Sequence, residues 1–165
     1  MLDAFLAFAR GDQMEDAVET DPVALVREVR AQMERSGNAV MLDIPAGTAP
    51  ETRVMLRYQA VCRALQNLLN NAAHYGDTVR LSLRLLPKTC EFIVEDDGPG
   101  IPAERREDVK KPFLRLDESR NLNKGGGVGL GLSIAQDVAH AHGGTLELGD
   151  SVELGGLKAI LRLPR

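Results

Sequence analysis

The segment from residue 58 to residue 75 constrains the fold most, because it is the longest stretch with an unbroken helical period. Apolar residues recur there at intervals of three and four, at Val61, Ala64, Leu65, Leu68, Leu69 and Ala72. This period predicts a long helix with one buried face. Such a face needs a second layer of structure to pack against, so the chain must supply a sheet or further helices beneath it.

The same helix carries a polar stripe within residues 67–75, which read NLLNNAAHY. At about 100° per residue, Asn67, Asn71 and His74 fall within roughly 60° of one another around the helix axis. A carboxamide oxygen is a hard ligand that suits Mg²⁺, so the stripe is consistent with a metal–phosphate site. The alternative is a solvated helix edge without a ligand, and this motif alone leaves both open.

The elements around this helix mix helices and strands without regular alternation. Asp21 before Pro22 predicts the start of another helix, which should stop near Ser36 and Gly37. Strands are expected at 39–44, 53–56, 79–85 and 92–95, a short helix around 103–109, a helix that runs to His142, and closing strands at 144–149 and 157–163. This order predicts an α+β fold, a two-layer sandwich in which about three helices cover one face of a mixed β-sheet.

The first residues have a short apolar helical pattern of their own. Leu2, Phe5, Leu6 and Ala9 repeat at helical spacing, and Gly11 ends the pattern. We expect residues 1–14 to be the end of a preceding helix with its linker, and residues 15–165 to form one domain. A terminal helix docked on its own domain is the alternative.

Length, charge and cysteine usage narrow the function classes. At 165 residues the chain fits one domain, and a net charge of −4 leaves no basic face for nucleic acid. It has no apolar run of about 20 residues and no signal-peptide pattern, which favours a cytoplasmic domain without direct membrane contact. Cys62 and Cys90 lie outside any metal-ligand spacing and are expected to be reduced thiols, although a disulfide remains open.

A second motif, Asp96-Asp97-Gly98-Pro99-Gly100-Ile101, follows an expected strand. A carboxylate leaves the sheet there, and two glycines allow close approach of the backbone. Asp96 is therefore a candidate acceptor for the amino group of an adenine base. An acidic turn at a strand end is the alternative.

A third motif is the glycine-rich stretch from Lys124 to Leu132, which reads KGGGVGLGL and runs into a helix. Exposed backbone N–H groups and a helix N-terminus together favour an anion such as a polyphosphate. The pattern is neither a P-loop nor a dinucleotide fingerprint, and a flexible linker is the alternative.

In this order, the three motifs resemble the Bergerat ATP-binding fold of the GHKL superfamily, which includes DNA gyrase, MutL, chaperone ATPases and sensor histidine kinases. Asn67 separates the branches, because the ATPases and serine kinases have a catalytic Glu at that position and histidine kinases have Asn. From about residue 15 to residue 165, the chain resembles the catalytic and ATP-binding domain of osmosensor-type histidine kinases.

The resemblance implies ATP and Mg²⁺ as cofactors and assigns a role to each matched residue. Asn71 would coordinate Mg²⁺, and Asn67 and His74 would be the catalytic side chains near the phosphates. The remaining cofactor-binding positions would be Tyr75, Asp96, Gly98, Gly100 and Ile101 around the adenine, Phe113, Arg115 and Lys124 in a lid, and Gly127, Val128, Gly129, Leu130, Gly131 and Leu132 at the phosphates. Three positions depart from the usual pattern: Lys110 replaces an aromatic residue, His74 a Lys or Arg, and Val128 a hydroxyl residue.

The implied activity is transfer of the γ-phosphate to a histidine on a separate dimerisation and phosphoacceptor domain, with a response regulator as an indirect partner. In the family that the chain resembles, the acceptor is a histidine followed by an acidic residue, and no histidine of this chain has that neighbour. His140 and His142 are instead expected to stabilise the C-terminus of a helix. The chain alone is therefore expected to be monomeric and to bind Mg-ATP without phosphorylating itself. A degenerate interaction module and a stand-alone GHKL ATPase are the alternatives, and Asn67 disfavours the second.

Overall fold

A five-stranded mixed sheet forms one layer of the molecule in the computed structural model, which describes residues 15–111 and 131–165. The strand order is β2-β4-β5-β7-β6, with bounds Met41–Asp43, Val79–Leu85, Thr89–Asp96, Leu157–Pro164 and Thr145–Asp150. Strand β2 is parallel to β4, and the other neighbours are antiparallel. Consecutive strands β4 and β5 form an antiparallel hairpin.

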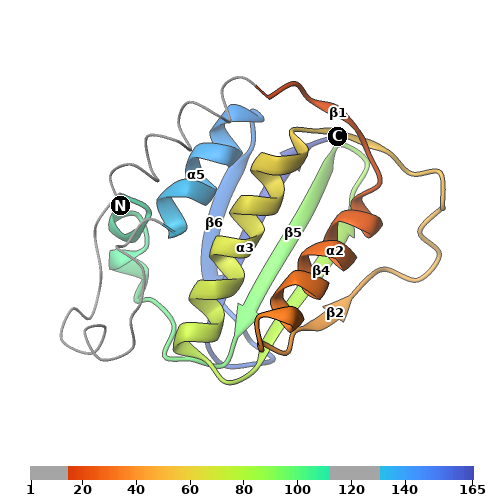
Figure 1. Ribbon diagram of the computed structural model, residues 1–165. Helices are drawn as coiled ribbons and strands as arrows, with labels where there is room; N and C mark the ends of the chain where they lie inside the picture. Colours follow the sequence, from red (N-terminus) through yellow and green to blue (C-terminus); the bar gives the residue numbers. More distant parts are fainter. Residues whose placement is uncertain (1–14, 112–130) are drawn as a thin grey trace.

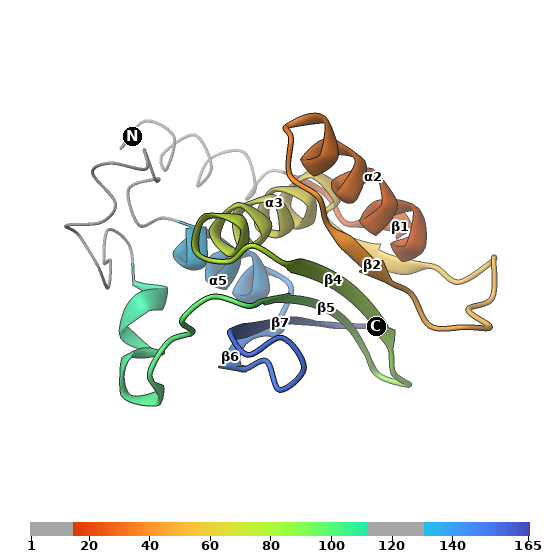
Figure 2. The same ribbon diagram turned by 90° about the horizontal axis from the view of Figure 1, so that it is seen from below.

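Three helices make the second layer: α2 (Pro22–Arg35), α3 (Tyr58–Tyr75) and α5 (Gly131–Ala141). They lie side by side on one face of the sheet, with α3 between the other two (Figure 1). Seen from below, the opposite face of the sheet has no helix of the described residues on it (Figure 2). The expected α+β two-layer sandwich is confirmed.

The core fills the space between the helices and the sheet. All six apolar residues predicted for the inner face of α3 are buried, and they pack with apolar residues of the inner sheet face such as Leu81, Phe92 and Leu161. At about 25 cal/mol per Å² of buried apolar surface, this single core supplies the main stabilisation of the fold. Because α3 lies over the middle of the sheet, the polar stripe of α3 is held in a fixed place.

The first turn of α3 is capped by side chains distant in sequence. Arg57, the residue before the helix, provides no side-chain cap. Instead, the carboxylate of Glu15 accepts from the N–H groups of Gln59 at 2.7 Å and Ala60 at 3.0 Å. The Nε2 atom of His142 accepts from the Arg57 N–H at 3.1 Å. An anionic cap also suits the positive end of the helix dipole.

Three segments differ from the sequence expectations. Strands β1 (Val18–Thr20) and β3 (Val54–Leu56) form a separate two-stranded antiparallel sheet, and only β3 was foreseen. The strand expected at 39–44 is shorter. The helix expected at 103–109 is instead two short 3-10 helices, Ala103–Arg105 and Asp108–Lys110. Only Val109 is buried in these two helices, so an apolar face that would stabilise a longer helix is missing.

Cys62 and Cys90 are both buried and free, which confirms the two reduced thiols. None of the described helices has the length and apolar content to cross a bilayer.

Candidate functional site

The polar stripe of α3 is half-buried along its length. Asn67, Asn71 and His74 each have intermediate exposure, and the amide nitrogen of Asn67 donates to the carbonyl of Arg63 at 2.9 Å. The ring of His74 meets that of Tyr75 edge to face, with centroids 4.8 Å apart. Tyr75 is 39% exposed. The stripe and the neighbouring Tyr75 therefore present amide, imidazole and phenol groups on the partly exposed side of α3.

The start of α5 lies against the α3 backbone at Asn67. A Cβ atom at Gly131 would be 3.5 Å from the carbonyl oxygen of Asn67 and 3.8 Å from its Cβ. The two helices are therefore close at this point, and the first turn of α5 meets the stripe at its upstream end. A helix N-terminus is a favourable place for an anion.

Asp96, the last residue of β5, is almost completely buried, with 3% of its surface exposed. Its Oδ1 atom accepts from the backbone N–H of Gly98 at 2.9 Å and of Leu157 at 3.2 Å. Within residues 15–111 and 131–165, no group donates a hydrogen bond to Oδ2. The carboxylate is thus fixed through one oxygen, and the other can accept from a ligand.

Burial raises the pKa of the Asp96 carboxyl above its ordinary value, although the backbone N–H groups of Gly98 and Leu157 act in the opposite direction. A buried carboxylate that is kept despite this cost is a typical feature of a functional site. The Asp96 carboxylate is therefore positioned by the protein through Oδ1, and its Oδ2 atom can accept a hydrogen bond from a ligand.

Gly98 and Gly100 shape the loop after β5, as the sequence predicted. A Cβ at Gly98 would lie 2.7 Å from the carbonyl oxygen of Tyr75, so only glycine lets this loop reach the end of α3. Gly100 has a φ of +72°, in the left-handed region that favours glycine. The loop and the downstream end of the stripe are therefore in contact.

The second carboxylate of the motif, Asp97, was not assigned a role from the sequence. Its Oδ1 atom accepts from the N–H groups of Asp77 at 2.7 Å and Thr78 at 2.9 Å. These bonds hold the pKa of Asp97 below its ordinary value. Asp97 ties the connection between α3 and β4 to the loop, so the two adjacent carboxylates differ in role.

Sequence reasoning also missed Gly156 and Leu157 at the start of β7. The N–H of Gly156 donates to the carbonyl of Asp96 at 3.0 Å, and a Cβ on Gly156 would lie 2.6 Å from the Gly98 nitrogen. The Gly155–Gly156 pair before an apolar strand was the available signal, but a glycine pair is equally common in plain turns.

The structure brings each end of the segment 67–75 against one of the other two motifs. Asn67 contacts the start of α5, and Tyr75 contacts Gly98. Eight residues of helix separate the two contacts, which is roughly 12 Å along the axis. Ile101 packs at the margin of the core, and the side chain of Leu132 lies within it. Phe113, Arg115, Lys124, Gly127, Val128, Gly129 and Leu130 lie outside the described residues.

Lys110 stands where related sequences were expected to carry an aromatic residue. Its side chain is only 10% exposed, and its ammonium group pairs with Glu107 at 2.9 Å. The aliphatic part of the lysine is therefore covered while the charge reaches a partner, so this side chain fills space as an apolar one would.

Comparison with known proteins assigns the chain to a family. The family described as "Histidine kinase-, DNA gyrase B-, and HSP90-like ATPase" matches residues 57–165. This range covers well over half of the chain, from just before α3 to the C-terminus. The chain belongs to this family.

Among curated proteins, the sensor histidine kinase GtrS of Pseudomonas aeruginosa is 46% identical over 106 residues, which are 64% of this chain and 21% of GtrS. Among solved structures, the histidine kinase domain of the Escherichia coli osmosensor EnvZ is 34% identical with a TM-score of 0.65, over 91% of this chain and 88% of that one. The ATP binding domain of PrrB from Mycobacterium tuberculosis is 26% identical with a TM-score of 0.70, over 90% and 97%.

These similarities place the chain within the histidine-kinase branch, as a catalytic ATPase domain. The expected resemblance to osmosensor-type kinases is confirmed by the EnvZ domain. The chain spans about a fifth of the length of GtrS and of a second curated sensor protein that it matches.

Proposed function

We propose that this chain binds Mg-ATP between α3, the loop after β5 and the start of α5, and transfers the γ-phosphate to a histidine of a separate phosphoacceptor domain in two-component signalling. The observation that carries the proposal is the buried Asp96 carboxylate, fixed through Oδ1 beside the end of the polar stripe. Its second oxygen would accept from the amino group of adenine.

The proposed ligand contacts run along α3 from base to phosphate. Tyr75, Gly98, Gly100 and Ile101 would enclose the adenine with Asp96, and Asn71 would coordinate Mg²⁺. Asn67 and His74 would lie at the phosphates, together with the backbone from Gly127 to Leu132. Phe113, Arg115 and Lys124 would belong to the lid. The donor set suits the ligand, because carboxamide oxygens bind Mg²⁺ and a helix N-terminus binds phosphate.

Bound Mg²⁺ supplies charge neutralisation at the phosphates, and the chain supplies position. Phosphoryl transfer depends mainly on alignment and electrostatic stabilisation. Asn67 supports a kinase rather than a hydrolase, because it cannot remove a proton from water as a carboxylate would. The acceptor histidine, and a response regulator after it, would come from outside this chain.

We also propose that residues 15–165 form this catalytic domain and that residues 1–14 belong to the connection that precedes it. The packing of Glu15 against α3 supports a boundary at that point. The cytoplasmic location and the monomeric state of the isolated domain stay predictions.

The first test is calorimetric titration with Mg-ATP of the unmodified chain and of Asp96→Asn, which replaces the acceptor oxygen. We expect saturable binding by the unmodified chain and a loss of at least about tenfold in affinity for the variant, the range for a buried hydrogen bond to a charged group. Absence of binding by the unmodified chain would instead support a degenerate interaction module.

The second test uses ATP labelled on the γ-phosphate. The chain alone should acquire no stable acid-labile phosphate, and label should appear on the phosphoacceptor domain of the parent kinase when that domain is added. Steady release of inorganic phosphate without an acceptor would contradict the kinase proposal and favour an ATPase.

A further inference from the structure

On the helix-free face of the sheet, β5 carries a buried carboxylate directly before Asp96. Glu95 is only 5% exposed, and its Oε2 atom pairs with Arg80 on β4 at 2.6 Å. Arg80 also pairs with the exposed Glu153 in the loop between β6 and β7. An unpaired buried charge is costly, so Glu95 requires this partner to remain ionised.

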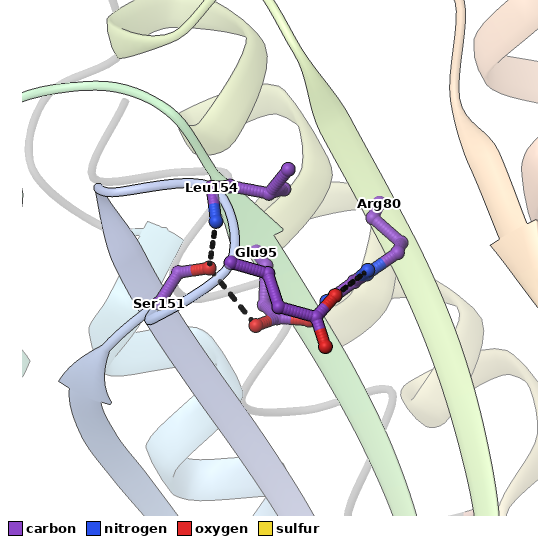
Figure 3. Close-up of polar contacts among 5 residues, drawn as sticks. Arg80, Glu95, Ser151 and Leu154 are labelled. Carbon is purple, nitrogen blue, oxygen red and sulfur yellow. Dashed lines mark hydrogen bonds and ion pairs between the residues drawn. The ribbon is translucent and has the colours of Figure 1, made fainter.

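Glu95 also anchors the loop between β6 and β7, residues 151–156. The hydroxyl of Ser151, itself 2% exposed, donates to Glu95 Oε1 at 3.0 Å. The same hydroxyl oxygen accepts from the N–H of Leu154 at 3.1 Å. Figure 3 shows this chain of contacts from Arg80 through Glu95 to Ser151 and Leu154.

The far end of this loop contacts Asp96 on the other side of the sheet. The backbone N–H of Ser151 donates a hydrogen bond to the carbonyl of Gly156 at 2.8 Å, which closes the loop. Gly156 donates to the carbonyl of Asp96, and the next residue, Leu157, donates to its carboxylate at 3.2 Å. The loop therefore joins the Glu95 carboxylate on one face to the Asp96 carboxylate on the other.

We propose that Glu95, Arg80 and Ser151 are positioning residues for adenine recognition: they fix the loop 151–156, and through Gly156 and Leu157 this loop sets the position of the Asp96 carboxylate. Adjacent residues of a strand point to opposite faces, so the Glu95 side chain lies on the face opposite the Asp96 side chain. Arg80 and Ser151 contact Glu95 on that opposite face. The proposal rests on the proposed ATP binding at Asp96.

The physical basis is the cooperativity of a buried polar network. Asp96 Oδ1 has two donors, and one of them, Leu157, is the first residue of β7, directly after the loop. When Ser151 no longer holds the loop to Glu95, Gly156 and the Leu157 N–H that follows it are held less firmly at their bonding positions. Bonds within such networks depend on one another, so the loss is transmitted to the Asp96 carboxylate.

The test compares two nucleotides that differ by one group. The affinities for Mg-ATP and for the magnesium complex of purine riboside triphosphate, which lacks the 6-amino group, are measured by calorimetry. For Ser151→Ala we expect Mg-ATP binding to weaken about fivefold, the effect of one hydrogen bond, with little change for the analogue. Glu95→Gln serves as a second variant with the same expectation, and the melting temperature of each variant verifies folding.

Glu91→Gln is the matched control. Glu91 is a buried carboxylate on the same face of the same strand, 4% exposed, and it pairs with Arg162 at 2.7 Å. Within the described parts of the chain, Glu91 makes no hydrogen bond to the loop 151–156. The control should lose stability but keep the preference for Mg-ATP over the analogue unchanged.

The outcomes separate this proposal from the one on which it rests. If Asp96→Asn abolishes the preference for Mg-ATP while Ser151→Ala and Glu95→Gln keep it, the positioning role is wrong and the adenine contact stands. If Asp96→Asn also keeps the preference, both proposals fail. An equal loss for Glu91→Gln would show a general effect of stability and would overturn the positioning role.

Discussion

At the scale of single residues, Asp96 and Asp97 show how strongly local surroundings decide the role of a side chain. Both are aspartates at the same strand end, yet burial raises the pKa of Asp96 and hydrogen bonds from the backbone lower that of Asp97. The sequence identified Asp96 as the candidate acceptor. The role of Asp97 depends on the path of the connection between α3 and β4, which no local pattern contains.

Asp96→Asn should raise the melting temperature at neutral pH, because the amide keeps an oxygen for Gly98 and Leu157 and removes a buried charge. A carboxyl group with a raised pKa in the folded state destabilises the fold when it is ionised. The difference from the unmodified protein should therefore shrink as the pH falls through the pKa of Asp96. Melting curves between neutral and acidic pH check this, and a lower melting temperature at neutral pH would contradict it.

At the scale of elements, the two caps of α2 and α3 mark the limit of prediction. Asp21 caps α2 through the N–H of Val23 at 2.9 Å, and the Asp-Pro pair predicted it. The cap of α3 comes from Glu15 and His142, which are distant in sequence. His142 also contacts the carbonyl of Val138 at 2.8 Å, in agreement with its expected place at a helix C-terminus. Sequence periods fixed the bounds of α3, but not its partners.

Glu15→Ala should destabilise the fold by about 1 kcal/mol, the typical cost of losing an N-cap acceptor. That corresponds to about 2–4 °C in melting temperature for a chain of this size. Asp16→Ala, at the adjacent exposed position, is the control and should change it little. Equal melting temperatures for both variants would show that the Glu15 contacts contribute nothing.

At the scale of the whole molecule, the layer arrangement followed from the sequence because each layer has one strong apolar face. The buried charges on the helix-free face were not foreseen. Alternation predicts exposed residues there, yet Glu91, Ile93 and Glu95 are all buried. The strand β5 lies between β4 and β7, and the long side chains of Arg80 and Arg162 from these neighbours pair with Glu95 and Glu91. Such burial depends on strand order, and strand order is a property of the complete fold.

The alkylation rates of the two thiols should show how easily the helix layer and the sheet each become accessible to solvent. Burial raises the pKa of Cys90 to about 12, and Cys90 lies on β5 with no exposed surface. Cys62 lines a cavity of about 570 Å³ between α2 and α3. We expect iodoacetamide to modify Cys62 faster than Cys90 in the native protein, by about tenfold or more, because local opening costs less than global unfolding. Peptide mass spectrometry measures both rates, and denatured protein, where the rates should be similar, is the control.

The cap on α3 has a mechanical consequence. An 18-residue helix is a stiff rod of about 27 Å, and the polypeptide is fastened at Glu15 to the end of this rod opposite Asp96. A displacement at Glu15 therefore acts on the element that bears the amide side chains through the two hydrogen bonds that Glu15 accepts.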